Sequence, residues 1–360
     1  MSGRVLLTGV GTVGREVLLG ILRRTSRDVL VVVRDRGRRR APDRATALFD
    51  EIGLSADERR RVTVLCGDVT SPGFGLGPAA LDGVIGSAEV IVHTAATTSL
   101  TADRELCDRV NRGGTAHALM IAERAFGAGV LTRFVHVSTA MVAGSLSDGR
   151  ILEDELPIAP AHGNYYESSK YDAERIVRAA MGAGLPAAIL RPSMVVGDSR
   201  TGRTRDFDVI YPLMRILASG YVTRFPAEPA APVHLAPLDM VVEGTLAAME
   251  TPWANGLTFH LTAPQPPTVA QLFGSDAFFP EGAARPQLCS PDDFDLASCP
   301  ARERDLLESV AFCFPYFCSR LTFDTSNVKR LIPLPVTDEA FLSRLGRFAI
   351  DSGYIRTAVA

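Results

Sequence analysis

The segment RVLLTGVGTVG, residues 4–14, carries the pattern that decides the fold. An apolar run leads into Gly-x-Gly-x-x-Gly, and the residues that follow from Arg15 repeat apolar side chains at helical spacing. Glycines in such a turn permit a tight bend and the close approach of a pyrophosphate, while the helix N-terminus supplies amide donors. The segment predicts dinucleotide binding between a strand and a helix, with a purely structural turn as the alternative. The residues expected at the dinucleotide are Thr8, Gly9, Gly11, Thr12, Val13 and Gly14.

Apolar runs of strand length alternate with helical segments along the first half of the chain. The run VLVVVR at 29–34 completes a strand, turn, helix and strand unit, which favours a parallel sheet with a right-handed crossover. Similar runs lie at 61–68, 88–96, 133–139 and 186–193. The alternation predicts an α/β fold with a doubly wound parallel Rossmann sheet, whose ligands bind at the carboxyl ends of the strands.

The pattern changes after Pro192, where polar and proline-rich segments interrupt the alternation. A chain of 360 residues suits one large domain with a smaller lobe. We expect residues 1–196 to form an NAD(P)-binding Rossmann domain, to which residues 233–263 return. Residues 197–232 and 264–360 are expected to form a smaller, mainly C-terminal lobe that binds substrate.

The composition is that of an ordinary globular protein. The chain is 46% hydrophobic and 22% charged with a net charge of -3, which provides no general attraction to nucleic acid. Its longest aliphatic runs fall far short of the roughly 20 residues of a membrane-spanning helix, and no secretory signal is recognisable. A cytoplasmic location is therefore expected. The six cysteines and six histidines show no metal-binding spacing, so we expect reduced thiols and no metal site.

The segment YYESSKYDAE, residues 165–174, pairs a tyrosine with a lysine. Side chains meet across a helical turn when they are three or four residues apart, which selects Tyr166 rather than Tyr165 as the neighbour of Lys170. A lysine ammonium beside a phenol lowers the pKa of the phenol and makes it a usable proton donor. Taken alone, the segment is better explained as a half-buried helix with a surface lysine. Whether Tyr166 and Lys170 are catalytic therefore depends on the other motifs in the chain.

The run RFVHVST ends on two hydroxyls, Ser138 and Thr139, which would lie at the same sheet edge as the glycine turn. A hydroxyl, a phenol and an ammonium beside a dinucleotide are the groups needed to hold a carbonyl oxygen while hydride arrives. This setting favours chemistry at Tyr166 and Lys170 over the structural alternative.

The end of the second predicted strand indicates the cofactor. A carboxylate there binds the ribose 2'-hydroxyl of NAD, whereas an arginine accommodates the 2'-phosphate of NADP. Arg34 comes first and Asp35 follows at once, with further basic residues behind them, so we expect NADPH in preference to NADH. At the end of the third strand, Asp68 is a candidate partner for the adenine amino group or a turn cap, and Val69 beside it is expected to contact the cofactor.

Together these motifs resemble the extended short-chain dehydrogenase/reductase superfamily, and within it the branch of thioester reductases and fatty acyl reductases with male-sterility-type NAD-binding domains. The similarity covers nearly the whole chain. It is carried by LLTGVGTVGREVL, GDVT, VIVHTAA, VNRGGTAHAL, FVHVSTAMVAG, YYESSKYDAE and LRPSMVVGDSRTG. The branch usually has TGxxGxxG, whereas this chain has one residue fewer between its first two glycines, which leaves open which amides meet the pyrophosphate.

The resemblance implies a role for each matching residue. Thr139, with Ser138 as the alternative, matches the hydroxyl that binds the carbonyl oxygen. Tyr166 matches the proton donor, and Lys170 matches the lysine that holds the nicotinamide ribose and tunes the tyrosine. Asn111 matches a helix asparagine that supports this lysine, with a surface or capping role as its alternative. The residues implied to line the cofactor groove are Ala95, Ala96, Pro192, Ser193 and Met194.

The reaction that this resemblance implies is NADPH-dependent reduction of an acyl thioester to an aldehyde, with a further step to the alcohol left open. The acyl group would arrive on coenzyme A or on an acyl carrier protein. One alternative is a ketone or aldehyde reductase, an alcohol dehydrogenase, or a nucleotide-sugar epimerase or dehydratase of the same fold. Another is a dinucleotide sensor without catalysis. A homodimer is also left open, and the stretch AFCFPYFC at 311–318 is expected to be core rather than acyl-pocket lining.

Overall fold

A parallel sheet of seven strands forms the centre of the protein, and the predicted α/β class is confirmed. The computed structural model describes residues 3–208, 210–276, 278–279 and 283–356. The strand order is β11-β7-β5-β4-β1-β2-β3, and every pair in this sheet is parallel. The strands are β1 (Arg4–Thr8), β2 (Val29–Val33), β3 (Val62–Cys66), β4 (Ala88–His93), β5 (Arg133–Val137), β7 (Ala187–Pro192) and β11 (Thr258–Leu261).

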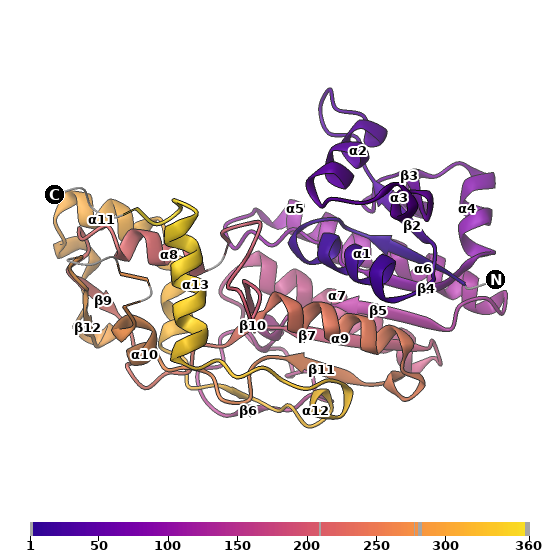
Figure 1. Ribbon diagram of the computed structural model, residues 1–360. Coiled ribbons are helices and arrows are strands. Elements are labelled where there is room, and N and C mark those ends of the chain that lie inside the picture. Colours follow the sequence, from indigo (N-terminus) through magenta and orange to yellow (C-terminus); the bar gives the residue numbers. More distant parts are fainter. Residues whose placement is uncertain (1–2, 209, 277, 280–282, 357–360) are drawn as a thin grey trace.

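Helices cover both faces of this sheet (Figure 1). Side chains alternate between faces along a strand, so Val5 and Leu7 pack with α1, α2 and α9, whereas Leu6 packs with α4, α6 and α7. The α-helices are α1 (Thr12–Arg24), α2 (Ala41–Glu51), α3 (Ala56–Arg60), α4 (Pro78–Ile85), α5 (Arg104–Cys107), α6 (Gly114–Gly127), α7 (Tyr165–Gly182), α8 (Ile210–Leu217), α9 (Leu238–Glu250), α10 (Val269–Gly274), α11 (Ala301–Glu308), α12 (Val328–Leu331) and α13 (Glu339–Asp351).

The direction of winding reverses beside β1. The chain runs outward through β2 and β3, and then returns to place β4 on the other side of β1. In open parallel sheets, ligands bind at such a switch point, beyond the carboxyl ends of the strands. The glycine turn directly follows β1, so it lies at this position.

A second hydrophobic cluster lies beyond the sheet, at the side occupied in Figure 1 by α8, α10, α11 and α13. Short strand pairs support it and connect it to the sheet: β8 (Met194–Val196) with β10 (Leu235–Pro237), and β9 (Arg224–Pro226) with β12 (Gln287–Cys289). A third pair, β6 (Arg150–Ile151) with β13 (Thr322–Phe323), lies near α12. The chain returns to the main sheet at β11, whereas α12 packs on α9. The exact limits of the two predicted domains remain a prediction.

One helical segment departs from its expected geometry. The sequence from residue 103 to 126 predicts one helical segment, but a π-helical turn, η2 (Asp108–Gly113), separates α5 from α6 and carries Asn111. Turns of this kind are rare and often lie at functional sites.

Among the described residues, no helix has the length and apolar character to cross a membrane.

Candidate active site

A cavity of about 640 Å³ lies at the switch point of the sheet. The glycine turn, the ends of β2 to β5 and β7, the start of α7 and the C-terminal lobe contribute to its walls. It brings together most of the predicted site residues. These are Gly9, Gly11, Thr12, Val13, Gly14, Arg34, Asp68, Val69, Ala95, Ala96, Thr139, Tyr166, Lys170, Pro192, Ser193 and Met194. Thr8 and Asn111 were also expected here, but they lie outside this lining.

The three glycines of the turn have different surroundings. Gly9 has φ +85° and lies so close to Ala95 that a Cβ would stand 2.6 Å from that backbone. A Cβ on Gly14 would stand 2.0 Å from the carbonyl oxygen of Gly9. At Gly11, by contrast, the position of a Cβ has no heavy atom within 4 Å, and Gly11 faces the cavity as the N-cap of α1. Two glycines therefore allow close packing, and the third leaves the room that a pyrophosphate needs at a helix N-terminus.

A buried hydroxyl at the other end of the groove also fits a polar ligand. Ser193 is 6% exposed and lines the cavity, and its Oγ has no hydrogen-bond partner among the described residues. A buried polar atom without a partner costs free energy unless a ligand or water satisfies it. The open space at Gly11 therefore fits the pyrophosphate in the middle of a nicotinamide dinucleotide, and the Ser193 hydroxyl offers a hydrogen bond to another part of it.

Arginines gather where the second strand ends. Arg34, Arg36 and Arg44 line the cavity, and a guanidinium nitrogen of Arg44 donates to the carbonyl oxygen of Arg34. Burial, and then the charges of the neighbouring arginines, lower the pKa of Arg44. Asp35 is occupied elsewhere, because it accepts from the amide of Ala41 at 2.7 Å and pairs with Arg40 at 3.0 Å. This end of the cavity is therefore lined by a cluster of positive charges, formed by Arg34, Arg36 and, from α2, Arg44.

Asp68 is a turn cap at the cavity wall, and its predicted contact with the adenine amino group stays a prediction. One carboxylate oxygen accepts from the amide of Thr70 at 2.9 Å, as a turn cap does, and the other lies 3.6 Å from Arg34. Burial opposes ionisation, but the bonds from Thr70 and the charge of Arg34 outweigh it and lower the pKa of Asp68. A charged carboxylate thus remains at the cavity wall, where it is able to accept a hydrogen bond.

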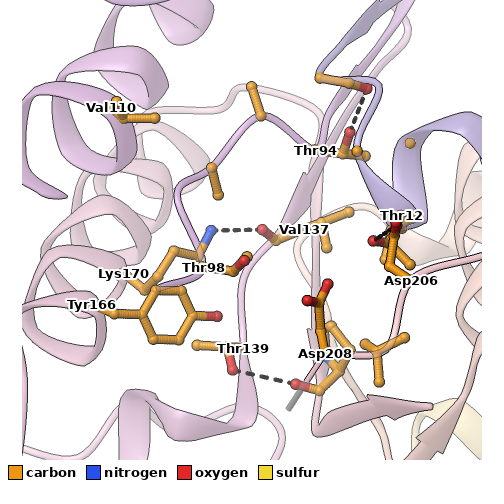
Figure 2. Close-up of a pocket in the computed structure, with 18 of the residues that line it drawn as sticks. Thr12, Thr94, Thr98, Val110, Val137, Thr139, Tyr166, Lys170, Asp206 and Asp208 are labelled. Carbon is orange, nitrogen blue, oxygen red and sulfur yellow. Dashed lines mark hydrogen bonds between the residues drawn. The ribbon is translucent and has the colours of Figure 1, made fainter. Parts of the chain in front are cut away.

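The first turn of α7 places Tyr166 in the cavity. The helix begins after Asn164, whose side chain accepts from the amide of Glu167 at 3.0 Å. Figure 2 shows both side chains reaching from α7 into the site, the Tyr166 phenol toward Thr139 and the Lys170 ammonium toward Val137. Tyr165 is 51% exposed and does not line the cavity, as the helical spacing predicts.

Burial controls the proton affinities of this pair. It raises the pKa of Tyr166 to about 12, although the hydrogen bond with Thr139 lowers it. It lowers the pKa of Lys170 to about 8, although the charge of Glu174 raises it. The expectation that Lys170 lowers the pKa of the phenol is wrong for the protein alone. The ammonium donates instead to the Val137 carbonyl at 2.7 Å, and desolvation of the phenol dominates (Figure 2).

The two hydroxyls at the end of β5 are used differently. Ser138 donates to the carboxylate of Glu174 at 2.7 Å. Thr139 faces Tyr166 and makes a long hydrogen bond of 3.4 Å to the carbonyl oxygen of Pro192. Because Ser138 is committed to a carboxylate, the arrangement favours Thr139 as the hydroxyl that meets a substrate oxygen.

Asn111 lies behind the cavity wall rather than in it. Its Nδ2 donates to the hydroxyl of Ser169 at 2.9 Å, and its Oδ1 accepts from the amide of Thr97 at 2.8 Å. The asparagine thus holds α7 one residue before Lys170, and its support of that lysine stays a prediction.

His93 is packed at its strand end, where hydrogen bonds join it to Thr8 at 2.7 Å and to Thr115. Burial and the charge of Lys170 lower its pKa to about 3, so this ring is neutral.

Two further walls of the cavity come from distant segments: Asp206 was not among the predicted site residues, and the aromatic stretch at 311–318 was expected to be core rather than lining. Asp206 lies over the glycine turn, where it accepts from the Thr12 hydroxyl at 2.6 Å and pairs with Arg15 (Figure 2). The segment η7 (Ala311–Phe317) contributes Cys313, Tyr316 and Phe317, of which Cys313 and Phe317 also belong to the lobe core. The aromatic stretch is therefore both core and lining. Loop composition alone carries no signal for contacts at such separations.

The nucleotide groove and the Thr139, Tyr166 and Lys170 cluster define an NAD(P)-dependent oxidoreductase of the short-chain dehydrogenase/reductase type. The chain belongs to the male sterility protein family of NAD-binding domains, whose sequence profile matches residues 7–245. The predicted superfamily and its thioester reductase and fatty acyl reductase branch are confirmed.

Curated relatives are larger proteins. The nonribosomal peptide synthetase asaC of Aspergillus flavus is 28% identical over 280 residues, which make up 74% of this chain and 26% of the relative. The fatty acyl-CoA reductase wat of Drosophila melanogaster is 24% identical over 281 residues, 69% of this chain and 54% of the relative. The chain thus spans about a quarter of the first relative and about half of the second.

Solved structures share the fold. The terminal R domain from the myxalamid PKS-NRPS pathway superposes with a TM-score of 0.85 at 22% identity and covers 99% of this chain and 92% of its own. UDP-glucuronic acid 4-epimerase from Bacillus cereus, in complex with NAD, superposes with a TM-score of 0.68 at 18% identity. The match covers 96% of this chain and 98% of the epimerase chain. At these identities the likeness concerns the fold alone.

Proposed function

We propose that this protein reduces an acyl thioester to an aldehyde with NADPH, with Tyr166 as the proton donor. The observation that carries the proposal is the position of Thr139, Tyr166 and Lys170. They lie in one cavity, between a nucleotide groove and a wall contributed by the lobe. The carbonyl oxygen would accept hydrogen bonds from the Thr139 and Tyr166 hydroxyls, which stabilise the negative charge that develops on it.

Bound NADPH would supply the hydride to the carbonyl carbon. Tyr166 then gives its proton to the oxygen, and the positive charge of Lys170 offsets the phenolate that forms. The resulting hemithioacetal loses the thiol when its C–S bond breaks and the C=O bond of the aldehyde forms. The net change consumes one thioester, one NADPH and one proton, and it yields aldehyde, thiol and NADP. A second hydride at the same site would give the alcohol.

The arginine cluster supports the preference for NADPH. Arg34 and Arg44 line the groove, whereas Asp35 is not among the residues that line it and contacts Ala41 and Arg40 instead. Guanidinium groups suit a 2'-phosphate, whereas a free carboxylate there would repel it.

The relatives support delivery of the acyl group on a carrier. Several are nonribosomal peptide synthetases, and one structural neighbour is a thiolation-reductase di-domain from an archaeal non-ribosomal peptide synthetase, with a TM-score of 0.78. We therefore propose a carrier-protein or coenzyme A thioester as the substrate, and residues 197–232 and 264–360 as the lobe that binds its acyl part.

The direct test follows NADPH absorbance with a panel of acyl-CoA thioesters, the matching aldehydes and simple ketones. Oxidation that depends on thioester, with thiol released, is the expected result. Turnover of ketones or aldehydes alone would remove the thioester proposal and leave a reductase of the same fold.

A further inference from the structure

A phenol from the C-terminal lobe holds the first turn of the catalytic helix. Tyr316, in η7, lines the cavity, and its hydroxyl donates to Oε1 of Glu167. The same hydroxyl accepts from Nδ2 of Asn164 at 3.1 Å. Asn164 is the N-cap of α7, and Glu167 directly follows Tyr166. One side chain, 150 residues further along the chain than Tyr166, thus contacts the residue after the proton donor and the N-cap two residues before it.

The charge of Glu167 matters for the chemistry. Its side chain is buried at 3% exposure, and its second oxygen accepts from the amide of Gly163 at 2.9 Å. A buried carboxylate beside a phenol opposes the negative charge that the phenol gains when it gives up its proton. Consistently, the charge of Glu167 is among the causes that raise the pKa of Tyr166. Proton donation therefore benefits from any group that draws this charge away from Tyr166.

Tyr316 is such a group. Burial, followed by the charge of Glu167, raises the pKa of the Tyr316 phenol, so it remains a protonated donor. A hydrogen bond to a carboxylate orients it and withdraws part of its charge, and such bonds are about twice as strong as neutral ones. The position of Glu167 between a backbone amide and this phenol therefore fixes where its negative charge lies.

We propose that Tyr316 is a positioning residue for proton donation by Tyr166, which acts by holding the Glu167 carboxylate away from the reacting phenol. The inference rests on the proposed function, in which Tyr166 is the proton donor. Cys313 and Phe317 lie on the same segment and line the same cavity. An acyl group packed against them would contact the segment that carries Tyr316, so substrate binding and proton donation share one structural element.

The test combines Tyr316→Phe, which removes only the hydroxyl, with Glu167→Gln, which removes the charge. Tyr171→Phe is the matched control, because this tyrosine lies on α7, donates to Pro157 at 2.9 Å and does not line the cavity. We expect Tyr316→Phe to lower kcat about tenfold, the order for losing a hydrogen bond to a charged group, while the Kd for NADPH stays the same. Tyr171→Phe should remain within about twofold of the wild type.

The double variant separates positioning from a structural role. Because Glu167→Gln removes the charge that Tyr316 holds, it should restore most of the kcat lost in Tyr316→Phe. A Tyr316→Phe enzyme as fast as the wild type, or a loss that Glu167→Gln does not relieve, overturns the inference. If the wild type reduces aldehydes but not thioesters, the thioester proposal fails, and the same comparison of variants is then made on the aldehyde.

Discussion

Glu174 connects α7 to the sheet, and its neutralisation should lower the stability of the protein strongly. Its carboxylate accepts from Ser138 at 2.7 Å, from Arg178 at 2.8 Å and from Arg191 at 2.6 Å. The Glu174 and Arg191 side chains are both 0% exposed. Removal of one charge from such a pair leaves the other buried without compensation, which costs about 3–5 kcal/mol. With an unfolding entropy of roughly 2.1 cal/mol/K per residue, Glu174→Gln should lower the Tm by about 4–7 °C.

A neighbouring pair on the same helix provides the control. Asp172 and Arg175 are 3.4 Å apart, but their side chains are 42% and 63% exposed. Exposed pairs contribute about 0–1 kcal/mol, so Asp172→Asn should shift the Tm by no more than about 1 °C. Thermal unfolding followed by circular dichroism compares the two variants. Equal shifts would refute the assignment of Glu174 and Arg191 as a buried pair.

The same substitution should change the pH dependence of the reaction. Burial lowers the pKa of Lys170 to about 8, and the charge of Glu174 works in the opposite direction. Lys170 is charged below its pKa, so activity that needs the ammonium falls as the pH rises through about 8. Without the charge of Glu174 the pKa drops further, and Glu174→Gln should lose activity at a lower pH than the wild type. A profile of kcat against pH that does not move would show that Glu174 does not act on Lys170.

Three further predictions address the rest of the site. Tyr166→Phe should reduce activity by at least about 100-fold, the scale of general acid catalysis, whereas Tyr165→Phe should largely spare it; equal losses would contradict the helix-face argument. Arg34→Ala combined with Arg44→Ala should raise the KM for NADPH about 10-fold or more and leave that for NADH within about twofold, and a parallel change in both would exclude a 2'-phosphate site. Asp206→Asn should tighten NADPH binding about two- to fivefold, measured by fluorescence titration, because a carboxylate at a helix N-terminus opposes a phosphate there. Weaker binding would show that Asp206 supports the cofactor instead.

Local patterns were sufficient for the sheet and for the choice of tyrosine. The aliphatic run at 29–33 is buried along its whole length because parallel strands are covered on both faces. The four-residue spacing to Lys170 correctly placed Tyr166 in the cavity and Tyr165 at the surface, because helical geometry alone decides which side chains share a face.

Contacts between distant segments were not predictable in this way. Asp206 meets Thr12 across 194 residues, and Tyr316 meets Glu167 across 149. Their local sequences are a polar loop and an aromatic stretch, which fit many environments. The pKa of Tyr166 was predicted in the wrong direction for the same reason, because desolvation depends on how deeply the fold buries a group.

The most direct test of the central claim measures thiol release and NADPH oxidation together, with purified protein and an acyl-CoA thioester. Thiol is detected with a chromogenic disulfide in samples withdrawn from the reaction. Thioester reduction predicts one thiol for each NADPH oxidised if the product is the aldehyde, and one for every two if reduction continues to the alcohol. Oxidation of NADPH that leaves the thioester intact, in a protein whose Tyr166→Phe variant is as active as the wild type, would contradict the account.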